Sequence, residues 1–145
     1  MRYARLLLAL TALLALGCFE ATGPAGLRVE LRTDRATFAP GDTFDGTFTV
    51  SNTAPILIRT QFGGMPRYEM EVYNEQDSAV IVSPWGYAQI MNELVLGPWC
   101  SESYRLGFVL RASEDTVPMR TGEYRIHVHL SGHDEPHDDL EIRVE

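Results

Sequence analysis

Four histidines near the C-terminus are the side chains whose types and spacing best suit chemistry. His127 and His129 are two residues apart, so on a β-strand they project from the same face. The acidic segment that follows could fold His133 or His137 over that pair. Imidazole nitrogens with a carboxylate suit Zn²⁺ or Cu²⁺, whereas carboxylate oxygens alone suit Ca²⁺. The sequence therefore predicts a metal site at His127, His129, His133 and His137, with a solvated strand face and polar loop as the alternative.

The sequence contains no familiar catalytic motif. It has no Gly-x-Ser-x-Gly elbow, no His-Glu-x-x-His motif and no glycine-rich phosphate loop. Cys100 lies beside Trp99, but no pattern in the sequence brings a histidine to it as a base. We therefore expect no catalytic residues, no enzyme activity and no cofactor other than a metal ion at the histidines.

The N-terminus has the features of a secretory signal. Arg2 and Arg5 precede an apolar run from Leu6 to Leu16, which is too short to span a bilayer permanently. The run leads into Leu-Ala-Leu-Gly-Cys, which resembles a bacterial lipobox. The resemblance implies cleavage before Cys18 and diacylation of its sulfur, and the alternative is a plain signal peptide with an incidental cysteine.

These features divide the chain into a signal peptide at residues 1–17, a lipidated cysteine with a tether at residues 18–26, and one domain at residues 27–145. The predicted location is the cell envelope, with the membrane as a partner through the N-terminal lipid. Phe19 replaces the aspartate that retains lipoproteins in the inner membrane of enteric bacteria. We therefore expect the outer membrane if the cell has two.

Charge and cysteine content narrow the possible partners. The chain has 12 basic residues, all arginine, against 20 acidic ones, and its net charge of −8 disfavours nucleic acid as a partner.

Once Cys18 is lipidated, Cys100 is the remaining thiol, so no internal disulfide can form. We expect Cys100 to be a small buried hydrophobic residue; an intermolecular bridge or a reactive thiol is the alternative.

From residue 27 onward the hydrophobic pattern has a period of two, and no stretch shows sustained helical periodicity. Glycine, proline and asparagine separate the runs, as expected at turns. The pattern predicts an all-β, Ig-like antiparallel β-sandwich of about seven to nine strands after the N-terminal helical signal segment. Its core should contain Tyr68, Met70, Val72, Phe108 and Val128. The alternating runs lie at residues 27–32, 44–50, 56–59, 68–72, 94–96, 104–110, 124–130 and 140–144.

Three aromatic residues lie in the least regular part of the sequence, residues 83–101. Trp85, Tyr87 and Trp99 are candidates for a protein-contact surface, because aromatic side chains on irregular segments often form interfaces. The alternative is that these rings close the end of the core.

Several segments occur in the order found in BsuPI-type domains, an Ig-like family named for an intracellular proteinase inhibitor. The chain resembles this family from about residue 38 to residue 130, and the resemblance implies an Ig-like fold and proteinase inhibition. It departs from the family in its export signal and in Pro98-Trp99-Cys100, which extends a turn. The similar segments are 40–42 (Pro-Gly-Asp), 48–53 (Phe-Thr-Val-Ser-Asn-Thr), 67–73 (Arg-Tyr-Glu-Met-Glu-Val-Tyr), 83–85 (Ser-Pro-Trp), 94–97 (Leu-Val-Leu-Gly) and 121–124 (Thr-Gly-Glu-Tyr).

Two functional hypotheses follow. The first is a non-enzymatic envelope lipoprotein whose sandwich binds another protein, with a proteinase as the partner that the resemblance implies. The second is a lipoprotein that binds or buffers metal through the histidine-rich C-terminal hairpin.

Overall fold

The structure, a computed structural model, describes residues 20–22, 25–63, 67–82, 92–111, 118–133 and 136–145. Every regular element in these ranges is a strand, and no helix long and apolar enough to cross a membrane was found there. The strands are β1 (Glu20–Thr22), β2 (Leu27–Thr33), β3 (Thr37–Phe38), β4 (Thr43–Asn52), β5 (Leu57–Phe62), β6 (Tyr68–Asn74), β7 (Ala79–Val82), β8 (Asn92–Leu96), β9 (Ser101–Val109), β10 (Gly122–Leu130) and β11 (His137–Val144).

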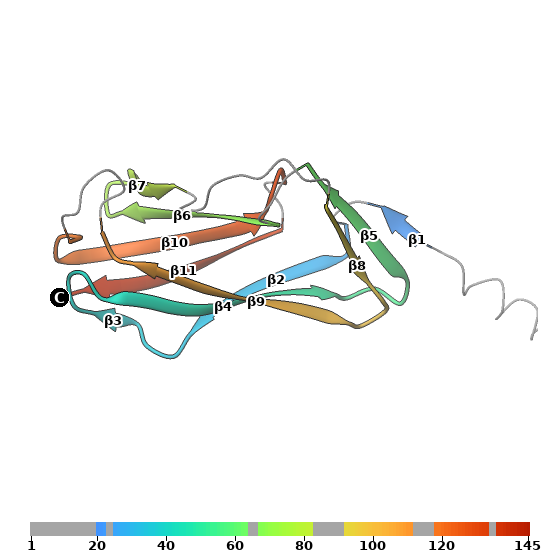
Figure 1. Cartoon of the computed structure of the whole chain (residues 1–145), viewed down its shortest axis with the longest axis horizontal. Coiled ribbons are helices and arrows are strands. Elements are labelled where there is room, and N and C mark those ends of the chain that lie inside the picture. Colours follow the sequence, from blue (N-terminus) through green and yellow to red (C-terminus); the bar gives the residue numbers. More distant parts are fainter. Residues whose placement is uncertain (1–19, 23–24, 64–66, 83–91, 112–117, 134–135) are drawn as a thin grey trace, which may run out of the picture.

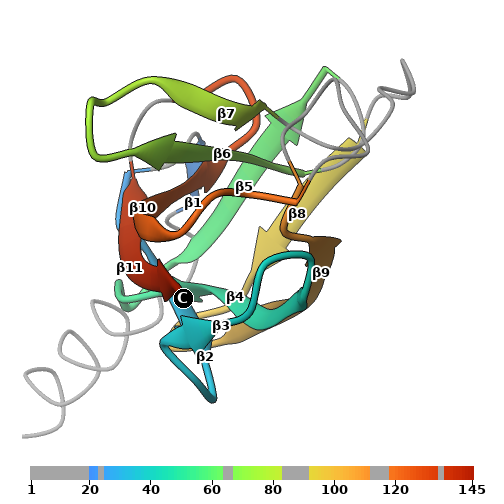
Figure 2. The ribbon, with the colours of Figure 1, turned by 90° about the vertical axis from the view of Figure 1, so that its left-hand side faces the viewer.

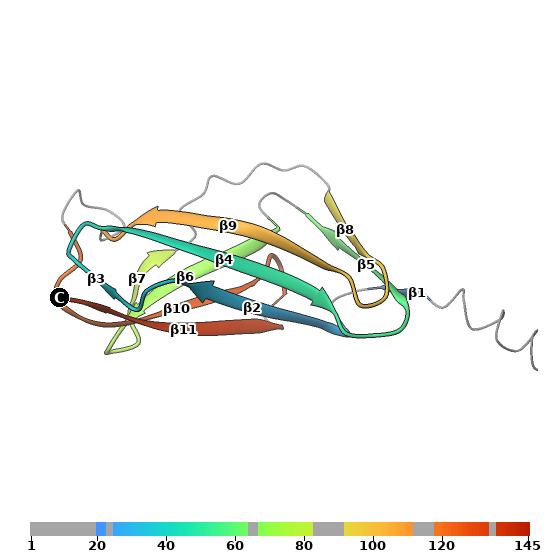
Figure 3. The same ribbon diagram turned by 90° about the horizontal axis from the view of Figure 1, so that it is seen from below.

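The strands form three sheets, with the orders β3-β11-β10-β6-β7, β2-β4-β9 and β1-β5-β8. The pairings are antiparallel except those of β1 with β5 and of β3 with β11. Viewed along the molecule, β6 and β7 lie above β4 and β9 (Figure 2). Strands β2, β4 and β9 run side by side along the length, and β5 and β8 lie at the end beside β1 (Figure 3). The predicted all-β sandwich is confirmed.

The core lies between the inward faces of these sheets. In β4 every second residue from Phe44 to Asn52 is buried, as the alternation of apolar and polar residues predicts. All five residues expected in the core belong to one buried cluster. These residues are Tyr68, Met70, Val72, Phe108 and Val128.

Arg67, just before β6, links the three sheets. Its guanidinium donates to Glu102 Oε1 at 2.9 Å and to the Tyr104 hydroxyl at 3.2 Å, both on β9. It also donates to Asn92 Oδ1 on β8 at 3.0 Å. Burial raises the pKa of Tyr104, although Arg67 opposes that shift. The basic residue before the Tyr-x-Met-x-Val strand therefore joins residues of all three sheets.

The structure has more strands than the seven to nine expected. The additional ones are short: β3 has two residues and β7 has four. Runs of that length show too few alternations to be distinguished from loops. Residues Glu20–Thr22 were predicted to belong to the tether. They form β1 instead and pair with Leu57–Arg59 of β5. The predicted signal peptide and Cys18 lie outside the described residues.

Candidate metal site on the β10–β11 hairpin

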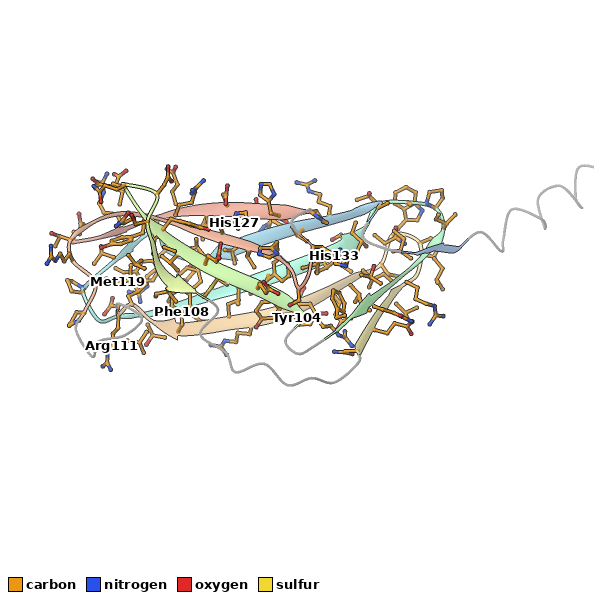
Figure 4. The ribbon with its side chains drawn as sticks, turned by 90° about the horizontal axis from the view of Figure 1, so that it is seen from above. Tyr104, Phe108, Arg111, Met119, His127 and His133 are labelled. Atoms are coloured by element: carbon orange, nitrogen blue, oxygen red, sulfur yellow. The ribbon has the colours of Figure 1, made fainter. Side chains whose placement is uncertain are left out.

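The β10–β11 hairpin determines which polar side chains meet. Ile126, Val128 and Leu130 are fully buried in the core, so the intervening His127 and His129 point outward. The antiparallel register places His137 opposite His129 and Asp139 opposite His127. His127 lies in the middle of the hairpin and His133 at its turn (Figure 4).

His127, His137 and Asp139 form a group of possible metal ligands. Each offers one ligand atom, and these atoms lie within 4.8 Å of one another. The imidazole centroids of His127 and His137 are also 4.8 Å apart. Nδ1 of His127 lies 2.7 Å from Oδ1 of Asp139, so the ionised carboxylate accepts a hydrogen bond from Nδ1 and leaves Nε2 as the available nitrogen.

His129 lies beside this group. Its ring centroid is 5.4 Å from that of His127. Its Nδ1 is 2.8 Å from the carbonyl oxygen of His133 and 3.1 Å from that of Leu130. Carbonyl oxygens only accept hydrogen bonds, so Nδ1 of His129 is the donor in these contacts.

The His133 side chain points elsewhere. Its ring meets Phe62 of β5 edge-on, with the centroids 6.2 Å apart. The structure thus brings His127 and His137 together, leaves His129 adjacent, and places His133 against another sheet. Asp139 was not among the predicted ligands. The antiparallel register that pairs His129 with His137 is the signal that would have placed it opposite His127.

Acidic side chains surround the group. On β6, Glu71 lies opposite His127 and Glu69 opposite His129. The Tyr73 hydroxyl donates to Glu71, and this hydrogen bond, with burial, raises the pKa of Tyr73. Arg125 is the nearby cation, with its Nη1 3.8 Å from Asp139 Oδ2. This arrangement favours a cation over an anion, and two imidazoles favour Zn²⁺ or Cu²⁺ over Ca²⁺.

The remaining predicted site residues lie far from the histidines in sequence. Trp85 and Tyr87 fall outside the described residues. Trp99 lies in the turn between β8 and β9 and is 68% exposed. The expectation that Cys100 is buried is wrong, because Cys100 is exposed and closes that turn instead of occupying an inward strand position.

Comparisons with known proteins support the fold. No protein-family model and no curated protein matches the sequence. Among solved structures, the chain is similar to a β-glucosidase from Listeria innocua, with 13% identity, a TM-score of 0.50, and coverage of 81% of this chain but 16% of the enzyme. A β-glucosidase from Erythrobacter marinus gives 11% identity, a TM-score of 0.54, and coverage of 82% and 15%.

The DNA glycosylase AlkC of Pseudomonas fluorescens, solved bound to DNA, is also similar. It shows 15% identity and a TM-score of 0.52, and the match covers 85% of this chain and 31% of AlkC. The chain therefore spans less than a third of each of these proteins. At such identities the likeness shows a shared fold, and the class that it defines is a β-sandwich domain.

Proposed function

We propose that this protein is a non-enzymatic, lipid-anchored envelope protein that binds a transition-metal ion on the outer face of its β10–β11 hairpin. The observation that supports metal binding is the group of His127, His137 and Asp139, whose ligand atoms lie within 4.8 Å of one another. The fold holds the histidine of β10 on a rigid strand, because its neighbours Ile126 and Val128 are fully buried.

The hydrogen bonds assign different roles to the three residues: the two histidines would be ligands, and Asp139 would orient one of them. His127 would bind the ion through Nε2, since its Nδ1 is bonded to Asp139. Asp139 would hold the imidazole in this orientation, a role that typically changes metal affinity by 10–100-fold. His137 would supply a second nitrogen, and water would complete the coordination on the exposed side.

Titration calorimetry of the detergent-solubilised full-length protein with Zn²⁺ and Cu²⁺ tests this function. We expect saturable binding with one ion per chain, abolished in His127→Ala/His137→Ala. Asp139→Asn should weaken binding about 10–100-fold. His133→Gln is the matched control, because that ring packs against Phe62, and it should bind like the wild type. Equal titration curves for wild type and double variant, or no heat with either metal, would contradict the proposal.

Protein binding, the first hypothesis from the sequence, depends on Trp85, Tyr87 and Trp99. Of these, Trp99 alone is among the described residues. Trp99 follows β8, which pairs with the same strand, β5, as the N-terminal strand β1, and this position favours a contact with the membrane over one with a protein.

A further inference from the structure

One end of the sandwich has turns without charged side chains. Residues 25–27, 51–58 and 96–101 contain no Asp, Glu, Lys or Arg, although charged residues make up 22% of the chain. Hydrogen bonds bring these segments together: Thr53 N donates to Gly26 O at 3.0 Å, and Asn52 N donates to Cys100 O at 2.9 Å. We call this set of residues the uncharged end. It lies at the β1 end of the molecule, opposite the C-terminus (Figure 1).

Trp99 is held exposed at the uncharged end by a tight turn. Cys100 N donates to Gly97 O at 3.1 Å, and Pro98 occupies the second position. Trp99, in the third position, has a φ of 61°, as in a type II turn where glycine is usual. This backbone conformation is unfavourable for a bulky residue, and with 68% of Trp99 exposed, core packing does not offset its cost.

Asn52 fixes this turn to the rest of the uncharged end. The side chain is buried, with 2% of the residue exposed. Its Nδ2 lies 3.1 Å from Leu96 O, 2.9 Å from Gly97 O and 2.7 Å from Ile56 O. Its Oδ1 accepts from Ala54 N at 2.8 Å. The orientation of Trp99 relative to β5, and therefore to β1, is thus set by buried hydrogen bonds.

The N-terminal strand limits how far this end can be from an anchored lipid. Strand β1 begins at Glu20, which pairs with Leu57 at the start of β5, and Ile58 of β5 pairs with Leu96 just before the Trp99 turn. Cys18 precedes Glu20 by two residues, a span of at most about 7 Å. Acyl chains on Cys18 would bring the head-group region close to the uncharged end.

We propose that the uncharged end rests on the lipid bilayer, with the Trp99 ring inserted at the boundary between head groups and acyl chains. The inference rests on that part of the proposed function in which Cys18 is lipidated. Tryptophan prefers this boundary because its ring is apolar and its indole N–H can bond to head groups. The net charge of −8 would become still more negative once the signal peptide, with Arg2 and Arg5, is removed. Such a charge would repel anionic lipids, and an end without charged turns reduces that repulsion. The β10–β11 metal site would then face the aqueous side.

Depth-dependent fluorescence quenching tests this orientation. The acylated Trp85→Phe variant, in which Trp99 is the single tryptophan, is reconstituted into phosphatidylcholine vesicles containing lipids brominated at shallow acyl positions. We expect a loss of Trp99 emission in these vesicles relative to unbrominated ones. The control is Trp85→Phe/Trp99→Phe/Glu123→Trp, which moves the single reporter to an exposed position at the opposite end. Its emission should be unchanged.

Mass spectrometry of the same preparation distinguishes failure of the lipid anchor from failure of the membrane contact. Absence of acyl chains from Cys18 would overturn the anchor in the proposed function, and this inference with it. Acylated protein whose Trp99 emission is as insensitive to brominated lipid as the Glu123→Trp control would overturn the membrane contact alone. Photocrosslinking from position 99 to a protein in native membranes, with no lipid adduct, would overturn it in favour of a protein partner.

Discussion

Asn52 and Asn74 end β4 and β6 at opposite ends of the sandwich, and they hold their turns in different ways. Buried Asn52 uses its amide nitrogen as a donor to carbonyl oxygens from two turns. Half-buried Asn74 uses Oδ1 as an acceptor from Gln76 N and Ser78 N, both at 3.0 Å. The first arrangement requires an amide, whereas a carboxylate would also satisfy the second. The same residue type therefore carries different constraints at the two ends.

The surfaces around the two asparagines also differ, because charged side chains surround Asn74 and none lie in the turns that Asn52 joins. Around Asn74 lies an open groove of about 340 Å³ whose lining includes Glu75, Asp77, Glu123 and Glu141. Exposed ion pairs, such as Arg125 with Asp77 at 2.9 Å, cross this end. Beneath it, Phe44 packs against Phe108 and Phe38. Phenylalanine packing thus underlies the charged end, whereas at the uncharged end a buried amide adds hydrogen bonds to the aliphatic core of Leu27, Ile58 and Leu96.

The largest loss of stability should come from a substitution in the aromatic core beneath the charged end. Phe108→Ala removes a ring whose centroid lies 5.0 Å from that of fully buried Phe44. The lost contacts and the cavity should lower the free energy of unfolding by about 3–5 kcal/mol. Chemical denaturation followed by far-UV circular dichroism measures it. A loss below about 1 kcal/mol would mean that this cluster does not hold the sheets together.

Substitution of Asn52 should produce the next largest loss of stability. It also gives the clearest test of the difference between the two ends. Asn52→Ala leaves buried carbonyl oxygens and Ala54 N without their partner, at a cost of about 2–3 kcal/mol. Asn52→Asp should be at least as destabilising at pH 7, because a carboxylate cannot donate to those oxygens.

Asn74→Asp is the matched control. Its carboxylate can still accept from Gln76 N and Ser78 N. In 1 M salt, which screens the repulsion from Glu75 and Asp77, we therefore expect a free energy of unfolding within about 0.5 kcal/mol of the wild type. If aspartate is tolerated equally at both positions, the donor role of Asn52 is wrong. In that case the Trp99 turn would not depend on a buried amide.

Local alternation was sufficient to predict the longer strands and the sandwich, but not the contacts between turns. The core side of β10 follows from Ile126, Val128 and Leu130, and hence the outward direction of His127 and His129. The network of Asn52 joins residues 44 and 45 positions apart in the sequence, which no local pattern reveals. The partnership of Asp139 with His127 depends on hairpin register. Trp99 occupies a turn position where glycine is usual, so its residue type gave no warning of a positive φ.

The smallest effect should come from an exposed ion pair near the charged end, Arg105 with Asp45. Nε of Arg105 donates to Asp45 Oδ1 at 3.0 Å, and a second hydrogen bond joins Nη2 to Oδ2. These hydrogen bonds to Arg105 lower the pKa of Asp45 in the folded state. A lowered pKa stabilises the fold above the unfolded-state value of about 3.9, and the stabilisation is lost as the pH falls through the folded-state pKa.

Arg105→Gln removes this contribution. Because both side chains are exposed and screened by water and salt, we expect a melting temperature only slightly below that of the wild type at pH 7. The difference should disappear at low pH, where Asp45 is protonated, and it should shrink in 1 M salt. Thermal denaturation of both proteins at several pH values measures it. If Arg105→Gln lowers the melting temperature at pH 7 as much as Asn52→Ala does, the prediction is wrong. The exposed ion pair would then stabilise the charged end as strongly as the buried amide stabilises the uncharged end.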